Sequence, residues 1–221
     1  MQEALLNRIG EETHGVASER RGLLLRQLGD VYAAHRGRIQ SELVDRFIDI
    51  AVTLLDGATL FERMAFANVL ADYGDAPARL VDHMLRDVYL VARPLIERGA
   101  LSQDRLMELM DDDKRELTYL MIAQRPKTKV AVTDRLVEEG SVKVLVALAG
   151  NAGAELSAKA FEALGDIAIE NPDMDAALAN RADLPPSIAK RLMRRVSKGA
   201  EDRVSSLMAR DLGKKKTLVL R

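Results

Sequence analysis

The sequence predicts an all-α fold, an α-solenoid of stacked short helix pairs that follows an N-terminal helical region. The first observation is an internal repeat, because residues 123–137 and 179–193 align without a gap and share four identities. A third copy is expected at Ala149-Gly150-Asn151, so the repeating unit is about half the offset between those two segments, a length typical of stacked helical units. The second observation is composition: Leu, Ala and Val supply most apolar side chains, and aromatic residues make up only 4%. This mixture is typical of helices that pack on helices, and stacked helices usually present a surface and not a reaction centre.

The first helix is expected to begin near Ser18, after a short leading segment. A single apolar stripe at helical spacing indicates it: Leu23, Leu24, Leu28, Val31 and Tyr32. A second stripe follows Gly37 and predicts another helix over about 39–56. These two helices are expected to form an antiparallel pair.

The third helix is expected to begin at Thr59, because Glu62 follows it at the spacing of a capping box. Its apolar side is expected to consist of Phe61, Met64, Ala65, Val69 and Leu70. Residues 77–98 predict a helix pair broken near Asp87. Pro94 falls inside the second helix of that pair, so either this helix is kinked or the break lies elsewhere.

The rest of the chain predicts short helices separated by regular breaks. Ser102 is expected to cap the next helix, and another covers 116–122. The β-prone run 142–146 suits a short buried helix equally well. Proline residues fit the first turns of two later helices: Pro172, and either Pro185 or Pro186. The pattern as a whole predicts roughly ten to twelve helices.

A change in composition near residues 111–113 suggests how the chain is organised, because the helical units after it are shorter and more alike. We expect an N-terminal helical region over residues 1–75, a helical repeat array over 76–212 and a basic tail over 213–221.

Several classes of protein are excluded by composition. The chain has no cysteine, which rules out a disulfide scaffold, a thiol nucleophile and Cys-ligated zinc. No segment approaches the ~20 apolar residues of a membrane span, and the first residues are too acidic for a secretory signal. A soluble cytoplasmic protein with no membrane contact is expected.

The charge is unevenly distributed, although the net charge is only −1. Residues 181–221 contain 12 Lys and Arg against 4 Asp and Glu, a net of +8. At helical spacing, six of the cations form a basic face that could bind an anionic partner: Lys190, Arg191, Arg194, Arg195, Lys198 and Arg203. Lys214-Lys215-Lys216 extends it. A merely solvated face is the alternative.

Arginines recur in register in the repeat. Arg125 matches Arg181, and Arg135 matches Arg191. They could form a ladder that binds a phosphate or carboxylate bidentately. Alternatively, Arg125 and Arg181 could be structural and bond the carbonyl ends of neighbouring helices.

No catalytic constellation stands out, so we expect a protein that is not an enzyme and has no cofactor or metal. His83 lies beside an acid on a predicted helix, but its context favours an ordinary surface histidine over a phosphoacceptor. The acidic run 111–113 lacks the spaced partners of a cation site and is read as a solvated turn. Nucleotide-loop, zinc-protease and serine-nucleophile motifs are absent.

The repeat units resemble a known family. The run 76–95, together with 101–106, 123–125, 151–164 and 180–185, is similar to an uncharacterised, chiefly alphaproteobacterial family of HEAT-like helical repeat proteins, a domain of unknown function. The resemblance spans roughly residues 20–210 and implies a HEAT-like α-solenoid. It implies no catalytic residues.

The predicted function is therefore a regulatory scaffold or adaptor that binds a protein partner through the groove between successive helices. The alternative is sequence-nonspecific binding of nucleic acid through the basic C-terminal helix and tail. The oligomeric state is left open.

Overall fold

A computed structural model describes residues 2–13, 18–73 and 75–194 of the chain. The described residues form an all-α structure, with twelve named α-helices, one 3₁₀ helix and no named strand. The chain divides into two compact units, residues 1–126 and 127–221. The boundaries expected at 75/76 and 212/213 stay predictions.

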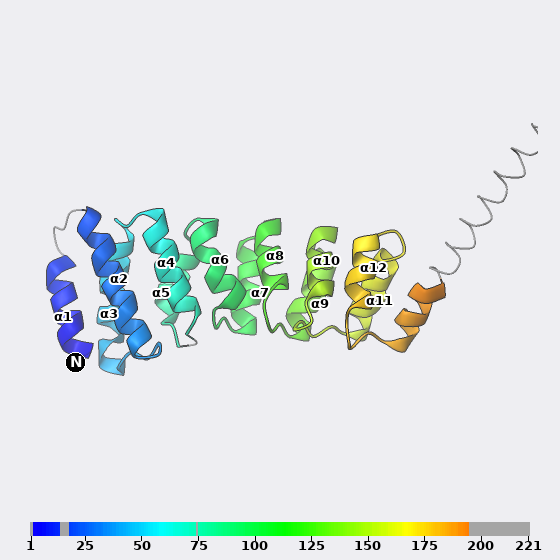
Figure 1. Ribbon diagram of the computed structural model, residues 1–221, viewed down its shortest axis with the longest axis horizontal. Helices are drawn as coiled ribbons and strands as arrows, with labels where there is room; N and C mark the ends of the chain where they lie inside the picture. Colours follow the sequence, from blue (N-terminus) through cyan, green and yellow to red (C-terminus); the bar gives the residue numbers. More distant parts are fainter. Residues whose placement is uncertain (1, 14–17, 74, 195–221) are drawn as a thin grey trace, which may run out of the picture. The chain divides into compact units, whose positions relative to one another are not determined.

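The first unit contains eight α-helices in the part that the structure describes (Figure 1). They are α1 (Gln2–Thr13), α2 (Ser18–Ala34), α3 (Val44–Leu55), α4 (Leu60–Ala71), α5 (Ala78–Leu85), α6 (Tyr89–Arg98), α7 (Gln103–Asp112) and α8 (Glu116–Ala123), with the 3₁₀ helix η1 (Ser41–Leu43) before α3.

Helices of the first unit pack in two rows. The even-numbered helices α2, α4, α6 and α8 contact one another in order, and the odd-numbered helices α1, α3 and α5 do the same. Consecutive helices such as α5 and α6 also pack together, so each helix pair lies on the next. The apolar faces of α1 to α6 form one continuous core.

The second unit contains α9 (Val130–Glu139), α10 (Val142–Gly150), α11 (Ala158–Ile167) and α12 (Pro172–Ala179), and residues 186–194 are also helical. Here α9 contacts α11, and α10 contacts α12. The β-prone run 142–146 is therefore helical, capped by Ser141. Pro172 occupies the first turn of α12 as expected.

The helix pairs recur along the sequence at a steady interval. Helices α5, α7, α9 and α11 begin at Ala78, Gln103, Val130 and Ala158. The spacing between successive starts is about half of the offset between the matching segments, which begin at Ala123 and Ala179. The expected length of the unit is confirmed.

Capping predictions are confirmed at two positions. Thr59 and Glu62 form a complete capping box at the start of α4, and the Ser102 hydroxyl accepts a hydrogen bond from the backbone N–H of Arg105. The expected break near Asp87 separates α5 from α6, and α6 continues through Pro94.

The leading segment is where the sequence interpretation was wrong, because residues 2–13 form a helix. Leu6 and Ile9 of α1 are fully buried against the core. The Gln2 side chain fastens this helix by donating to the carbonyl oxygen of Arg38 and accepting from the N–H of Gln40. The buried face of this helix consists of few residues, and two of them, Gln2 and Thr13, are polar. Its apolar stripe is therefore too short to be recognised in the sequence.

The buried faces predicted for the helices that contain Leu23 and Phe61 were also partly wrong, because these two side chains point to solvent. Leu23 is 53% exposed and Phe61 is 80% exposed, whereas Leu24 and Leu25 are buried. Successive side chains on a helix point about 100° apart, so three consecutive leucines cannot all face the same core.

No helix among the described residues is both long enough and apolar enough to cross a membrane.

Candidate functional site

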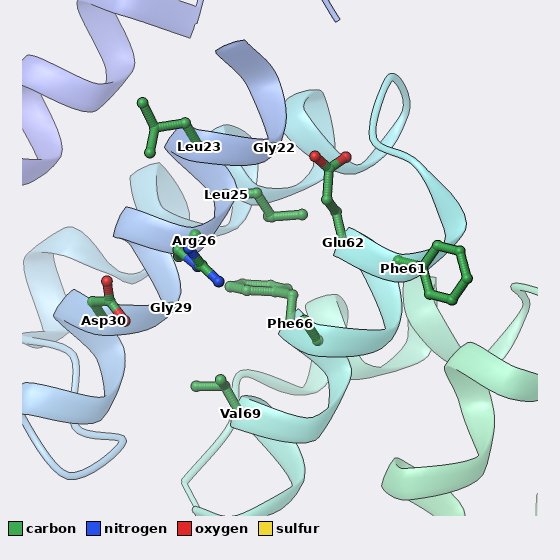
Figure 2. Close-up of a pocket in the computed structure, with 11 residues that line it drawn as sticks. Gly22, Leu23, Leu25, Arg26, Gly29, Asp30, Phe61, Glu62, Phe66 and Val69 are labelled. Atoms are coloured by element: carbon green, nitrogen blue, oxygen red, sulfur yellow. The ribbon is translucent and has the colours of Figure 1, made fainter. Parts of the chain in front are cut away.

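A groove with a cavity volume of about 540 Å³ lies between α2 and α4 in the first unit. Figure 2 shows the two helices side by side with the groove between them. Every lining residue belongs to one of these two helices. The groove is therefore formed by side chains of two neighbouring even-numbered helices.

The floor of the groove is made by small residues and by two buried apolar side chains. Gly22 and Gly29 are two turns apart on one face of α2, and Leu25 and Phe66 are almost fully buried between them. A Cβ atom at position 22 would lie 1.5 Å from Oε1 of Glu62, whereas one at position 29 would lie 3.5 Å from the Phe66 ring. The absence of a side chain at Gly22 thus leaves room for Glu62.

Glu62 is held in this place by the first turn of α4. Its carboxylate accepts a hydrogen bond of 2.7 Å from the backbone N–H of Thr59, and the Thr59 hydroxyl accepts from the N–H of Glu62. This reciprocal pair satisfies two N–H groups at the start of the helix. It also fixes the end of the groove at Gly22.

The rims of the groove are apolar and exposed. Leu23 of α2 and Phe61 of α4 lie on opposite sides of it (Figure 2). Ala65 and Val69 extend the α4 side. A phenylalanine that is 80% exposed is a more informative observation than an exposed polar residue, because large exposed apolar side chains mark interaction surfaces when they cluster.

Two opposite charges complete the groove. Arg26 and Asp30 are one turn apart on α2, and both are exposed. Neither forms an ion pair within the described residues. By contrast, nearby Arg63 of α4 is fixed to Asp87 at 2.7 Å, and Arg20 is fixed to Glu12 at 2.9 Å.

Arg125, one of the arginines expected to form a ladder, is 7% exposed at the end of α8. Its guanidinium donates to the carbonyl oxygens of Ile96 and Gly99 at the end of α6. Burial lowers its pKa. The side chain therefore satisfies the carbonyl group of Ile96, which the last turn of α6 leaves unpaired, and adds a second donor to that of Gly99, which also accepts from the N–H of Leu101.

Arg181 does the same at the end of α12, and it is 6% exposed. It donates to the carbonyl oxygens of Ala149, Asn151 and Ala154, at and after the end of α10. Two hydrogen bonds from Arg181 lower the pKa of Asp183. Arg125 and Arg181 thus bond the carbonyl ends of neighbouring helices, which is the structural alternative of the sequence analysis. Both side chains are buried, so neither lies on a surface that could bind a phosphate or carboxylate.

The second matched pair of arginines forms ion pairs with acidic side chains. Arg135 pairs with Glu139 within α9 at 2.9 Å. Arg191 lies between Glu162 and Asp166 of α11, at 3.0 and 3.1 Å.

The structure places only part of the expected basic face. Lys190 and Arg194 are not buried, and the Arg191 guanidinium is taken by the acids of α11. Three further members of the face lie outside the described residues, and so does the 214–216 run: Arg195, Lys198 and Arg203.

The other candidates for chemistry have ordinary surroundings. His83 lies 3.9 Å from Asp56, and its side chain is 41% exposed. Asp113 accepts hydrogen bonds from Arg115 and Thr118, which hold its pKa at about 2. Within the described part of the chain, His, Asp and Glu side chains nowhere form a group of three that could hold a metal ion.

Sequence reasoning missed the groove between α2 and α4. The available signal was the spacing of Gly22 and Gly29, which lie two turns apart on one face of a helix that is otherwise rich in leucine. That spacing predicts a close neighbour or a depression at this face, but it does not show which helix lies there.

The chain was compared with protein families, curated proteins and solved structures. A family described as "Uncharacterised protein conserved in bacteria (DUF2336)" matches residues 91–220. No curated protein and no solved structure matches the chain.

Proposed function

The chain belongs to the DUF2336 family of bacterial proteins, and we propose that it is a non-enzymatic helical-repeat scaffold that binds a protein partner in the groove between α2 and α4. The observation that carries this proposal is the pairing of exposed apolar rims, at Leu23 and Phe61, with two charges that have no ion-pair partner within the described residues. The proposed setting is the bacterial cytoplasm, and the proposed role is regulatory.

A HEAT-like α-solenoid is the architecture that we propose for the scaffold. Two features support it: helix pairs recur at a steady interval from α5 to α11, and alternate helices pack on one another within each unit. Proteins of this kind work by presenting an extended surface of stacked helices.

A protein fits the groove better than a small molecule does. Small-molecule sites enclose most of the ligand's surface and contain a few converging polar groups. Here the rims are open, since Phe61 and Leu23 keep most of their surface in solvent. Aromatic and arginine side chains at a solvent-exposed depression are typical of the central contacts in protein interfaces.

The internal use of charge supports the same choice. Several arginines in the first unit fasten one helix to another, as Arg98 does to Asp72 at 3.0 Å and Arg105 to Asp82 at 2.8 Å. Other exposed charges of this unit, such as Arg46, also have no ion pair within the described residues, but Arg26 and Asp30 lie in the groove. Charges that the fold leaves unused are the ones that remain for a partner.

Nucleic-acid binding is the second candidate, favoured by the net charge of +8 over residues 181–221. Such binding would rest on phosphate contacts and would be sequence-indifferent and strongly salt-dependent. Lys190 and Arg194 are the accessible cations that the structure describes in this region.

Site-specific cross-linking tests the proposed function. The chain has no cysteine, so Ala65→Cys gives one attachment point for a photoreactive group on the α4 rim. Asp49→Cys on α3 is the matched control, because Asp49 is exposed on the other row of helices. We expect one protein to be cross-linked in the bacterial cell from position 65 and not from position 49. Equal labelling from both positions would refute binding at the groove.

A further inference from the structure

We infer that the partner segment that binds the groove between α2 and α4 is an amphipathic α-helix, whose apolar face contacts Leu23 and Phe61 and which presents an acidic residue to Arg26. This inference rests on the proposed function, that of a protein-binding scaffold, and it specifies the chemistry of the partner.

The backbone around the groove explains why the partner segment is a helix. All lining residues lie inside α2 or α4, from Gly22 to Asp30 and from Phe61 to Val69. The backbone N–H and C=O groups of helix interiors are already paired within the helix. Among the lining residues, Phe61 in the first turn of α4 has a backbone N–H that is not paired within the helix, so an extended segment would find almost no main-chain partners here and would lose its own hydrogen bonds to water. A helix brings its backbone groups already paired.

The shape of the floor fits a helix as well. Gly22 and Gly29 add no side chain to the α2 side of the groove, and Leu23 and Phe61 lie at its two outer edges (Figure 2). Helices pack about 8–10 Å apart when the side chains of one enter the groove of another. The cavity volume of about 540 Å³ is enough for several aliphatic side chains spaced three and four residues apart on such a helix.

The charges specify what lies beside those apolar residues. Arg26 and Asp30 are exposed one turn apart, and within the described residues neither has an ion-pair partner. Figure 2 shows the Arg26 side chain directed toward Phe66 across the groove. A helix that binds there desolvates this arginine and therefore needs an acidic residue facing it. A basic residue one turn away on the same helix would face Asp30.

A peptide selection on the full chain tests this inference. The library consists of helix-length peptides, half with apolar residues at helical spacing and half with the same composition in proline-containing, extended patterns. Peptides that bind are selected from the library separately on the natural chain, on Arg26→Glu and on the control Arg46→Glu, which reverses an exposed charge on α3. Each enriched peptide is also measured against Phe61→Ser.

We expect the natural chain to enrich helical peptides with Asp or Glu beside the apolar face. Arg26→Glu should weaken these peptides by about tenfold and select Lys or Arg at the same position, while Arg46→Glu changes nothing. Binding should fall at least about tenfold on Phe61→Ser, because an apolar anchor is lost.

Two results would overturn the inference. Enrichment of extended peptides that still depend on Phe61 would exclude the helix and leave the protein-binding function intact. Enriched helices that are unaffected by both Arg26→Glu and Phe61→Ser would show that the groove does not bind them, and the cross-linking from position 65 then decides the proposed function separately.

Discussion

The carboxylate of Glu62 occupies the space that a side chain at Gly22 would fill, since a Cβ there would lie 1.5 Å from Oε1. The same carboxylate closes the capping box at the start of α4. One missing side chain on α2 therefore permits both the close approach of two helices and the proper start of one of them. This contact forms one end of the groove to which we assign partner binding.

The two glycines of the floor should respond differently to alanine. Gly29→Ala should raise the free energy of unfolding by about 0.5–1 kcal/mol, because alanine favours the helix and its Cβ would make an ordinary contact with Phe66. Gly22→Ala should be less stable than Gly29→Ala by about 1 kcal/mol, because Glu62 must leave its capping position. Urea denaturation measures both. In a Glu62→Ala background the two alanines should give the same gain, and a persistent difference would contradict this explanation.

Arg125 should be among the most sensitive arginines of the chain. Arg125→Met should lower the free energy of unfolding by about 1–3 kcal/mol, because it leaves the buried carbonyl group of Ile96 without its donor and takes from Gly99 one of the two donors of its carbonyl group. Arg93→Met is the control, since Arg93 forms a half-exposed pair with Glu97 one turn away and should cost about 0.5 kcal/mol or less. Similar losses for both variants in chemical denaturation would argue against the carbonyl-capping role.

Asp113 should make the free energy of unfolding fall as the solution is acidified. The hydrogen bonds from Arg115 and Thr118 lower its pKa from 3.8 to about 2, so the folded state favours the charged form. Its contribution is complete above the unfolded pKa and is lost as the pH falls from about 4 to 2. At pH 7, Asp113→Asn should be less stable by about 1 kcal/mol. The gap between the two proteins should close by pH 2, and a gap that widens on acidification would reverse the predicted sign.

Duplex DNA binding separates the two candidate functions. Our account predicts no retention of the full chain on DNA, even at low salt. If the basic end binds nucleic acid, retention should fall steeply with added salt and disappear when Lys190, Arg194, Arg195 and Lys198 are changed to Ala. That pattern would favour the nucleic-acid alternative over the protein-binding scaffold.

Local sequence signals were enough to predict most helices. Thr59, Ser102 and Pro172 start helices where they were expected, because caps and first turns depend on residues that are adjacent in the chain. The internal repeat gave the length of the helix pair for the same reason, since each pair is built from one short segment.

The groove could not be predicted in the same way, because it depends on which helix packs beside α2. Periodicity placed Leu23 and Phe61 on apolar stripes, but it could not show that Leu24 and Leu25 are the leucines that face the core and that Leu23 is exposed. Similarly, the sequence match between Arg125 and Arg181 predicted an equivalent place in the repeat for both arginines. Only the fold showed that their guanidinium groups donate to carbonyl oxygens at the ends of α6 and α10.

The most direct test uses the partner protein that is cross-linked from position 65. Titration calorimetry measures its affinity for the natural chain and for the double variant Leu23→Ser, Phe61→Ser. Both side chains are largely exposed, so the double variant should keep its urea midpoint. We predict that its affinity falls at least about tenfold, because the apolar rims are lost. Unchanged affinity in a folded double variant would contradict binding in the groove between α2 and α4.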